Sequence, residues 1–388
     1  MTSLEKGAAN ALRVLLLCIF MAMTGLGVIS PIIPNYASDL GATGFMIGLL
    51  YSSFSISRAA LQAPIGRLAD RASKKKIIVT GLAAYTVTSI LYAYATSAEM
   101  LVAIRLFHGV ASAMVMPVAM AYAAELTPKG KEGRYMGYMS TAMFSGFGSG
   151  PLLGGFLYEH YSTAAAFHAM SALVGFSLIL TLILVPEEKS FRKIERRPRR
   201  SFREILSNRK LRAAFVYRLV NALGRGNIMS FLSLFAVQIL GISGTMVGVI
   251  LSVGIFANAL LQTPMGALAD RINKVKLIVV GGLVASIGYI YMIHTRSVPE
   301  LLLARLVVSA GGALSIPALT AIAAEEGKKL GAGSTMGVFN TAMSLGQIVG
   351  PVFSGILLDA YGMGAVFNFS GVIGILSVAA FYILSRER

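Results

Sequence analysis

Long apolar segments recur along the chain and are separated by short polar loops. Each segment holds about 20 residues, the length with which an α-helix crosses a hydrocarbon core of about 30 Å. The apolar residues are continuous rather than alternating, which argues against a transmembrane β-barrel. The pattern predicts twelve transmembrane helices, at about 13–34, 44–66, 76–96, 100–123, 135–157, 164–186, 212–237, 245–266, 276–295, 299–323, 335–358 and 363–385.

The second half of the chain repeats the first at an offset of 200 residues. LQAPIGRLADR at 61–71 returns as LQTPMGALADR at 261–271, and with no gap the same offset pairs Arg105 with Arg305. Two parallel six-helix halves, related by an axis along the membrane normal, are a known transporter layout. We therefore predict an all-α polytopic membrane protein of two six-helix bundles with pseudo-two-fold symmetry.

The longest polar stretch separates the two predicted bundles and sets the expected domain boundaries. These are an N-terminal bundle at 1–186, a basic cytoplasmic linker at 187–211 and a C-terminal bundle at 212–388. The linker is dense in arginine. It is either a solvated tether or includes a short amphipathic helix on the inner leaflet around 200–211.

Composition and charge support a membrane protein and set its orientation. Of the 388 residues 56% are hydrophobic and 13% charged, against about 25% charged in soluble proteins. The net charge is +17, but 28 of the 34 Lys and Arg fall on one predicted side, and Arg296 alone falls on the other. This split predicts a multi-pass cell-membrane protein with both termini in the cytoplasm. The basic excess is expected to contact lipid headgroups rather than nucleic acid.

Motifs for enzymatic or cofactor chemistry are missing from the sequence. Cys18 is the only cysteine, so no disulfide forms within the chain. No Gly-x4-Gly-Lys-Ser/Thr loop for ATP phosphates occurs. The four histidines have no evident acid partner within a predicted helix. We expect neither an enzyme nor a protein with a metal or cofactor.

The loop after the second predicted helix, and its copy in the second half, are candidates for a gate. A glycine there permits close helix contact. An acid at the inner helix end can pair with an arginine or with a helix N-terminus. Such a contact can latch two halves in one state and release them in another. The alternative is a plain basic turn. The residues are Gly66, Asp70, Arg71, Gly266, Asp270 and Arg271.

The fifth predicted helix carries a ladder of small residues. Glycines at this spacing let helix backbones approach closely, and a proline within the helix removes one backbone donor. We expect this ladder to permit motion between helices at the bundle interface. Its residues are Gly137, Gly146, Gly150, Pro151, Gly154 and Gly155.

Charges inside the predicted helices are candidates for substrate and proton coupling, because an intramembrane charge is costly. Asp and Glu do not occur in the middle of any predicted helix, so the site is expected to be net positive and to favour an anionic or neutral solute. Alternatively the arginines pair with helix carbonyls. His108 could carry a proton or be a neutral packing residue. The coupling candidates are Arg58, Arg105, His108, Arg225, Arg305 and, at an outer end, Asp39.

These motifs together resemble the major facilitator superfamily. The loop Gly66-x-Leu-Ala-Asp70-Arg71 is similar to its hallmark motif, with Ser73 where the family usually has glycine. Arg105-x-x-His108-Gly resembles the Arg-x-x-Gln/His-Gly pattern of drug–proton antiporters, where the arginine is linked to proton transfer. The glycine ladder is similar to the motif of the antiporter branches.

The resemblance implies two bundles around a central cavity that opens alternately to each side. It further implies a monomer that exports small amphipathic compounds across the lipid bilayer in exchange for protons. The rival is uptake or exchange of a small organic anion or other metabolite by a symporter or facilitator. Many drug–proton antiporters carry a membrane-embedded acid in helix one or four. The lack of one here leaves the proton carrier open.

Overall fold

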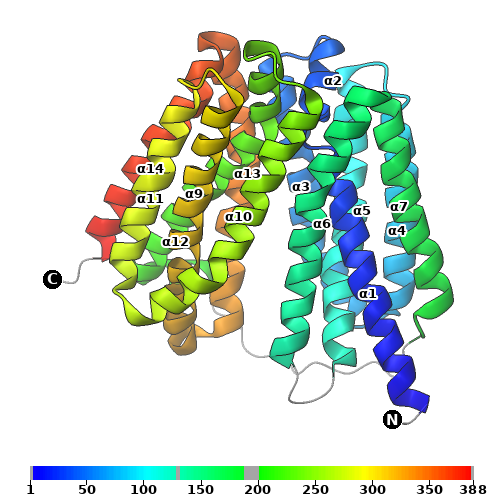
Figure 1. Cartoon of the computed structure of the whole chain (residues 1–388). Coiled ribbons are helices and arrows are strands. Elements are labelled where there is room, and N and C mark those ends of the chain that lie inside the picture. Colours follow the sequence, from blue (N-terminus) through cyan, green and yellow to red (C-terminus); the bar gives the residue numbers. More distant parts are fainter. Residues whose placement is uncertain (1–2, 128–131, 188–200, 386–388) are drawn as a thin grey trace. The chain divides into compact units, whose positions relative to one another are not determined.

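The computed structural model describes residues 3–127, 132–187 and 201–385. Within these ranges every regular element is a helix (Figure 1). Eleven helical segments of the described chain are long and apolar enough to span a membrane. The twelfth predicted span is α6 (Glu132–His160), whose 29 residues suffice in length but include many Gly and Ser. The predicted all-α polytopic class is confirmed.

The two repeats fold into corresponding helices. Five helices of the first repeat begin 200 residues before their counterparts: α3 (Gly44–Ala69) and α10 (Gly244–Arg271), α4 (Lys74–Tyr92) and α11 (Lys274–Met292), α5 (Ala98–Leu126) and α12 (Val298–Leu330), α6 and α13 (Ala332–Tyr361), and α7 (Thr163–Leu184) and α14 (Met363–Ser385). The others are α1 (Ser3–Val28), α2 (Ile33–Asp39), α8 (Phe202–Ser207), α9 (Arg209–Leu234) and the π-helix η1 (Phe235–Ile239).

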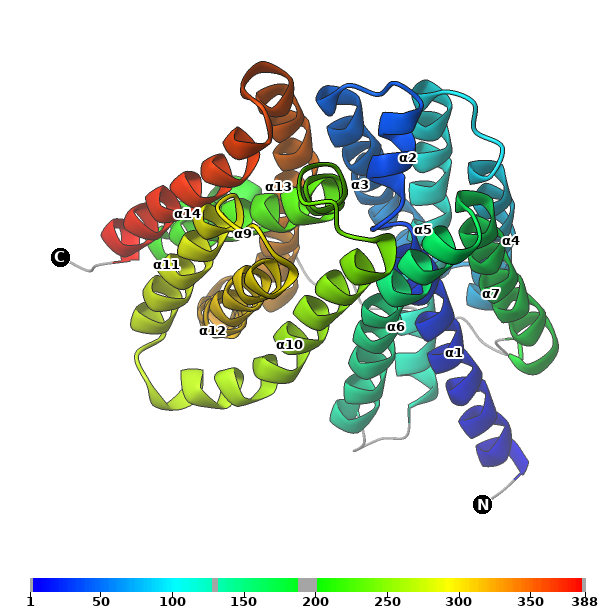
Figure 2. The same cartoon turned by 45° about the horizontal axis from the view of Figure 1, so that its top comes forward.

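Helix packing repeats as well. In the first repeat α1 packs against α6 and α7, and α4 packs against α5 and α7. In the second repeat α9 packs against α13 and α14, and α11 packs against α12 and α14 (Figures 1 and 2). The sequence repeat therefore corresponds to a repeated helix arrangement, as predicted.

The chain forms two compact units. Unit 1 consists of Met1–Gly41, Ser53–Glu195 and Ser243–Ser252, and unit 2 of Ala42–Ser52, Arg196–Ile242 and Val253–Arg388. The first turns of α3 thus belong to unit 2, and the first turns of α10 belong to unit 1. Most of the predicted linker, at 188–200, lies outside the described residues.

Helix ends follow local sequence signals. The hydroxyls of Ser73, Ser97 and Ser162 accept a backbone N–H in the first turns of α4, α5 and α7. Such caps satisfy donors that have no partner within the helix. The turns before α3 and α10 each contain a glycine with positive φ, 79° at Gly41 and 64° at Gly241, a conformation costly for other residues.

The first predicted helix, 13–34, is interrupted in the structure. Helix α1 ends at Val28, a turn follows, and α2 runs from Ile33 to Asp39. Pro31 lies in this turn, and a proline has no N–H with which to continue a helix.

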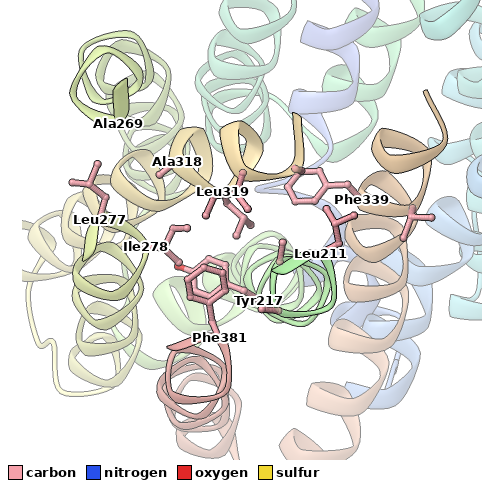
Figure 3. Packing of buried hydrophobic residues seen from close by; sticks show 14 of the residues in the cluster. Leu211, Tyr217, Ala269, Leu277, Ile278, Ala318, Leu319, Phe339 and Phe381 are labelled. Carbon is pink, nitrogen blue, oxygen red and sulfur yellow. The ribbon is translucent and has the colours of Figure 1, made fainter. Parts of the chain in front are cut away.

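One end of unit 2 has a well-packed apolar core (Figure 3). Leu211 and Tyr217 of α9 meet side chains of α11, α12, α13 and α14 there, and the rings of Tyr217 and Phe381 lie 5.8 Å apart. Ile205 of α8 is 1% exposed and belongs to the same core. The end of the predicted linker is therefore packed onto unit 2 rather than free.

Candidate functional site

Arg105 and His108 of α5 lie in an aromatic cluster inside unit 1. Both side chains are buried, 2% and 0% exposed. The Arg105 guanidinium lies 5.1 Å from the Phe54 ring centre. A hydrogen bond of 3.1 Å joins His108 Nδ1 to the Tyr92 hydroxyl, which also interacts with Arg105. The ring of Tyr85 lies 4.3 Å from that of His108.

His108 is the member of this cluster whose side chain can exchange a proton. His108 Nε2 has no hydrogen-bond partner within the described residues. An imidazole can take up or release a proton at such a nitrogen. The structure therefore brings together two of the predicted coupling residues, and it adds Phe54, Tyr85 and Tyr92. The sequence alone indicated that Arg105 and His108 lie together, since residues three apart share a helix face.

Arg58 joins the edge of this cluster, whereas Asp39 does not. Arg58 of α3 is half-buried and lies 5.9 Å from the Phe54 ring centre. Asp39 is the exposed last residue of α2, and its charge acts on Tyr158 of α6. The predicted grouping of Asp39 with the intramembrane arginines is thus not seen in unit 1.

Arg305 of α12 begins a chain of hydrogen bonds in unit 2. Its Nη1 donates to Ser309 Oγ at 2.8 Å, and that hydroxyl is 2.8 Å from the Gly254 carbonyl oxygen. Gly254 occupies the place of Phe54, and the Arg305 guanidinium fills the space that a side chain there would take. Arg105 and Arg305 thus correspond in sequence but have different surroundings.

Two arginines of α9 meet one methionine of α13 in unit 2. Arg218 Nη2 lies 3.1 Å from Met343 Sδ, and Arg225 Nη2 lies 4.0 Å from the same sulfur. Arg225 is one of the coupling candidates predicted from the sequence, but the sequence did not indicate Met343 as its neighbour. The spacing of seven residues places Arg218 and Arg225 on one helix face, a signal that was available.

The predicted gate residues lie at exposed helix ends. Asp70, Arg71, Asp270 and Arg271 are exposed, and none of the four forms an ion pair within the described chain. A Cβ added at Gly66 would meet no described atom within 4 Å. The expected close helix contact at Gly66 is therefore absent from the described structure.

Gly266 shows the same openness in unit 2. An added Cβ would meet only Pro317 Cβ, at 3.9 Å, an ordinary van der Waals distance. The gating role of both loop copies stays a prediction.

Ion pairs near these loops join other residues, at corresponding positions of the two repeats. Lys74 Nζ lies 3.2 Å from Glu125 Oε2 in unit 1, and Lys274 Nζ lies 2.9 Å from Glu325 Oε1 in unit 2. Each pair joins the start of one helix to the end of the next. The offset of 200 residues relates the two lysines and the two glutamates to each other, but it does not indicate that each lysine contacts a glutamate.

The glycine ladder of α6 forms the contact with α1. A Cβ at Gly146, Gly150 or Gly154 would collide with the carbonyl oxygen of Phe20, Thr24 or Val28, respectively. The predicted close backbone approach is seen at these three positions.

The rest of the ladder divides between contact and open space. Gly155 and Pro151 lie against Gly244 and Gly248 in the first turns of α10, within unit 1. Gly137 has open space beside it in the described structure. Its presence in the motif therefore has no packing explanation.

Two acidic side chains that sequence reasoning did not assign cap helices at corresponding positions. The Asp359 carboxylate of α13 accepts the backbone N–H groups of Gly44 and Phe45, within unit 2. Glu159 of α6 accepts the backbone N–H of Thr245, within unit 1. Among the described residues no group of three or more His, Cys, Asp or Glu could hold a metal ion.

The twofold repeat of long apolar helices, with buried charges in each copy, defines a polytopic membrane transporter. The sequence profile of the Major Facilitator Superfamily matches residues 15–220 and 214–388. The chain belongs to this family.

Similarity to individual proteins extends over nearly the whole length. An uncharacterized MFS-type transporter of Methanocaldococcus jannaschii is 32% identical over 364 residues, which cover 92% of this chain and 93% of that protein. Multidrug resistance protein 1 of Bacillus subtilis is 28% identical over 355 residues, 90% of each chain. The structure of a bacterial homologue of the human lysosomal transporter Spinster superposes with a TM-score of 0.84 over 98% of this chain and 97% of that chain, at 16% identity. This last likeness shows the fold alone.

Proposed function

We propose that the protein exports small amphipathic compounds across the cell membrane in exchange for protons. The observation that carries this proposal is the glycine ladder of α6, whose Gly146, Gly150 and Gly154 contact α1. This pattern is similar to the antiporter motif of the family. The full-length similarity to a Bacillus multidrug resistance protein supports the same direction.

The roles of individual residues follow from this proposal. Arg105 and His108 couple proton movement to substrate movement through their shared cluster with Tyr92. Asp70, Arg71 and their copies Asp270 and Arg271 act in the inner gate during rocker-switch alternating access. The protein works as a monomer, with both termini in the cytoplasm and without enzymatic activity.

A second candidate is uptake or exchange of a small organic anion. Arg218 and Arg225 favour it, because both point to a weak acceptor and leave N–H groups without partners in the described structure. A site of this charge would attract an anion.

Purified protein in liposomes with an acidic interior tests the proposed export. Proton exit should drive accumulation of an amphipathic probe, and two probes of fixed charge exclude passive trapping: ethidium and 1-naphthalenesulfonate. Accumulation should require both the protein and the gradient, and a proton ionophore should abolish it. If both probes accumulate to the same extent with and without the pH gradient, the protein does not couple their transport to protons.

A further inference from the structure

One face of α9 concentrates polar donors inside unit 2. Arg218, Asn221 and Arg225 follow the spacing i, i+3, i+7, which places them on one side of the helix. Arg218 is 8% exposed, while Asn221 and Arg225 are half-buried. Arg218 and Arg225 direct Nη2 to the sulfur of Met343, at 3.1 Å and 4.0 Å.

The donors on this face exceed the acceptors. A guanidinium carries five N–H donors, and a thioether sulfur is a weak acceptor. Nε and Nη1 of Arg218 and Nε of Arg225 have no partner within the described residues. No described carboxylate forms an ion pair with either arginine. A buried charge without a counter-charge is costly, so an anion bound by Arg218 and Arg225 would lower that cost.

The first repeat shows that the fold does not need these arginines. The corresponding positions of α1 are Cys18 and Gly25. Cys18 is buried, and its thiol forms a hydrogen bond of 3.0 Å with Thr181 Oγ1, so this position carries no charge in the first repeat. Two cations in the second copy alone indicate a role other than bundle formation.

The surroundings suit an organic ligand rather than an inorganic ion. The Arg218 guanidinium lies 4.9 Å from the ring centre of Phe339, which is 5% exposed. Met343 is half-buried beside it, and a flexible thioether adapts to different apolar shapes. Charge and apolar surface therefore lie side by side.

We propose that Arg218 and Arg225 bind the carboxylate of an amphipathic organic acid, which replaces the Met343 sulfur as acceptor. A carboxylate accepts parallel N–H bonds from the guanidinium fork, a geometry that lysine cannot provide. This inference rests on the proposed function to the extent that the bound acid is the exported compound.

Binding of 1-naphthoate and of its neutral counterpart 1-naphthamide to the purified full chain tests this site. Calorimetry at pH 7, without a gradient, should give at least about tenfold tighter binding of naphthoate. Arg218→Gln and Arg225→Gln should each weaken naphthoate binding about tenfold and leave naphthamide unchanged. Arg225→Lys should lose most of the same affinity, and the exposed Arg296→Gln is the matched control.

Several results would overturn the site. They are equal affinity of the unaltered chain for acid and amide, no naphthoate binding, or unchanged affinity in folded Gln variants. The comparison of acid with amide needs no variant, so a folding defect cannot obscure it. If naphthoate binds but no probe is exported in response to the gradient, the proposed function is wrong and the carboxylate site stands. If ethidium is exported in response to the gradient but naphthoate and naphthamide bind equally, the carboxylate site is wrong and the proposed function stands.

Discussion

The Asp359 carboxylate holds the start of α3 through the backbone N–H of Gly44, at 2.6 Å, a contact across 315 positions of sequence. Its second oxygen accepts the next N–H, of Phe45, at 2.8 Å. Both oxygens therefore satisfy donors that the helix leaves free, and the negative charge faces the positive end of the helix dipole.

Removal of this cap should destabilise unit 2. Asp359→Ala should cost about 1 kcal/mol and lower the thermal unfolding midpoint in detergent by about 2–4 °C. Asp359→Asn should recover only part of the loss, because an amide offers one acceptor oxygen instead of two and carries no negative charge. A midpoint of Asp359→Ala equal to that of the unaltered chain would show that the cap contributes nothing.

The two equivalent lysine–glutamate ion pairs differ in solvent exposure, so they show how burial affects the strength of an ion pair. Lys74 is 7% exposed and Glu125 39%, whereas Lys274 and Glu325 are 25% and 57% exposed. Since solvent screens an exposed pair, coupling should be larger in unit 1. A double-mutant cycle with Lys74→Met and Glu125→Gln should give about 1 kcal/mol, and the equivalent cycle in unit 2 a few tenths. Equal or reversed couplings would contradict the dependence on burial.

Helix positions were predictable because they depend on features local in sequence. Apolar length defines a membrane-spanning helix, and the offset of 200 residues predicted the matching helix starts that the structure shows. The α1–α6 contact was only half predictable. Spacing indicated that Gly146, Gly150 and Gly154 share a face, but it did not identify α1 as the partner.

The site was less predictable, because its contacts join distant helices. Met343 as partner of Arg218 lies 125 positions away, and Glu125 as partner of Lys74 depends on how α4 and α5 pack. A sequence pattern gives the face of a helix but not the side chain opposite. The same limit explains Gly66, whose conformational freedom suggested a close contact that is absent among the described residues.

Glycines within the ladder should differ sharply in their tolerance of a methyl group. Gly150→Ala places a Cβ against Gly27 and the Thr24 carbonyl, so it should destabilise the protein by about 1–3 kcal/mol. Gly137→Ala, in the same helix but facing open space, should be neutral or stabilising by up to about 1 kcal/mol. Yield and thermal midpoint of both variants provide the measurement. Similar destabilisation by both would show that helix packing is not the reason.

Arg105 should be required for coupling more than for folding. Its guanidinium lies against Phe54, and such a contact contributes about 1–2 kcal/mol when desolvated, so Arg105→Ala should still fold. Gradient-driven accumulation of the transported probe in liposomes should fall at least about tenfold, the effect of about 1.4 kcal/mol on a rate. Equilibration of the probe without a gradient should fall far less, which separates coupling from binding. Arg105→Lys retains the charge without the planar fork and should recover only part of the coupled rate. A full coupled rate in Arg105→Ala would exclude this residue from proton coupling and leave His108 as the candidate in the cluster.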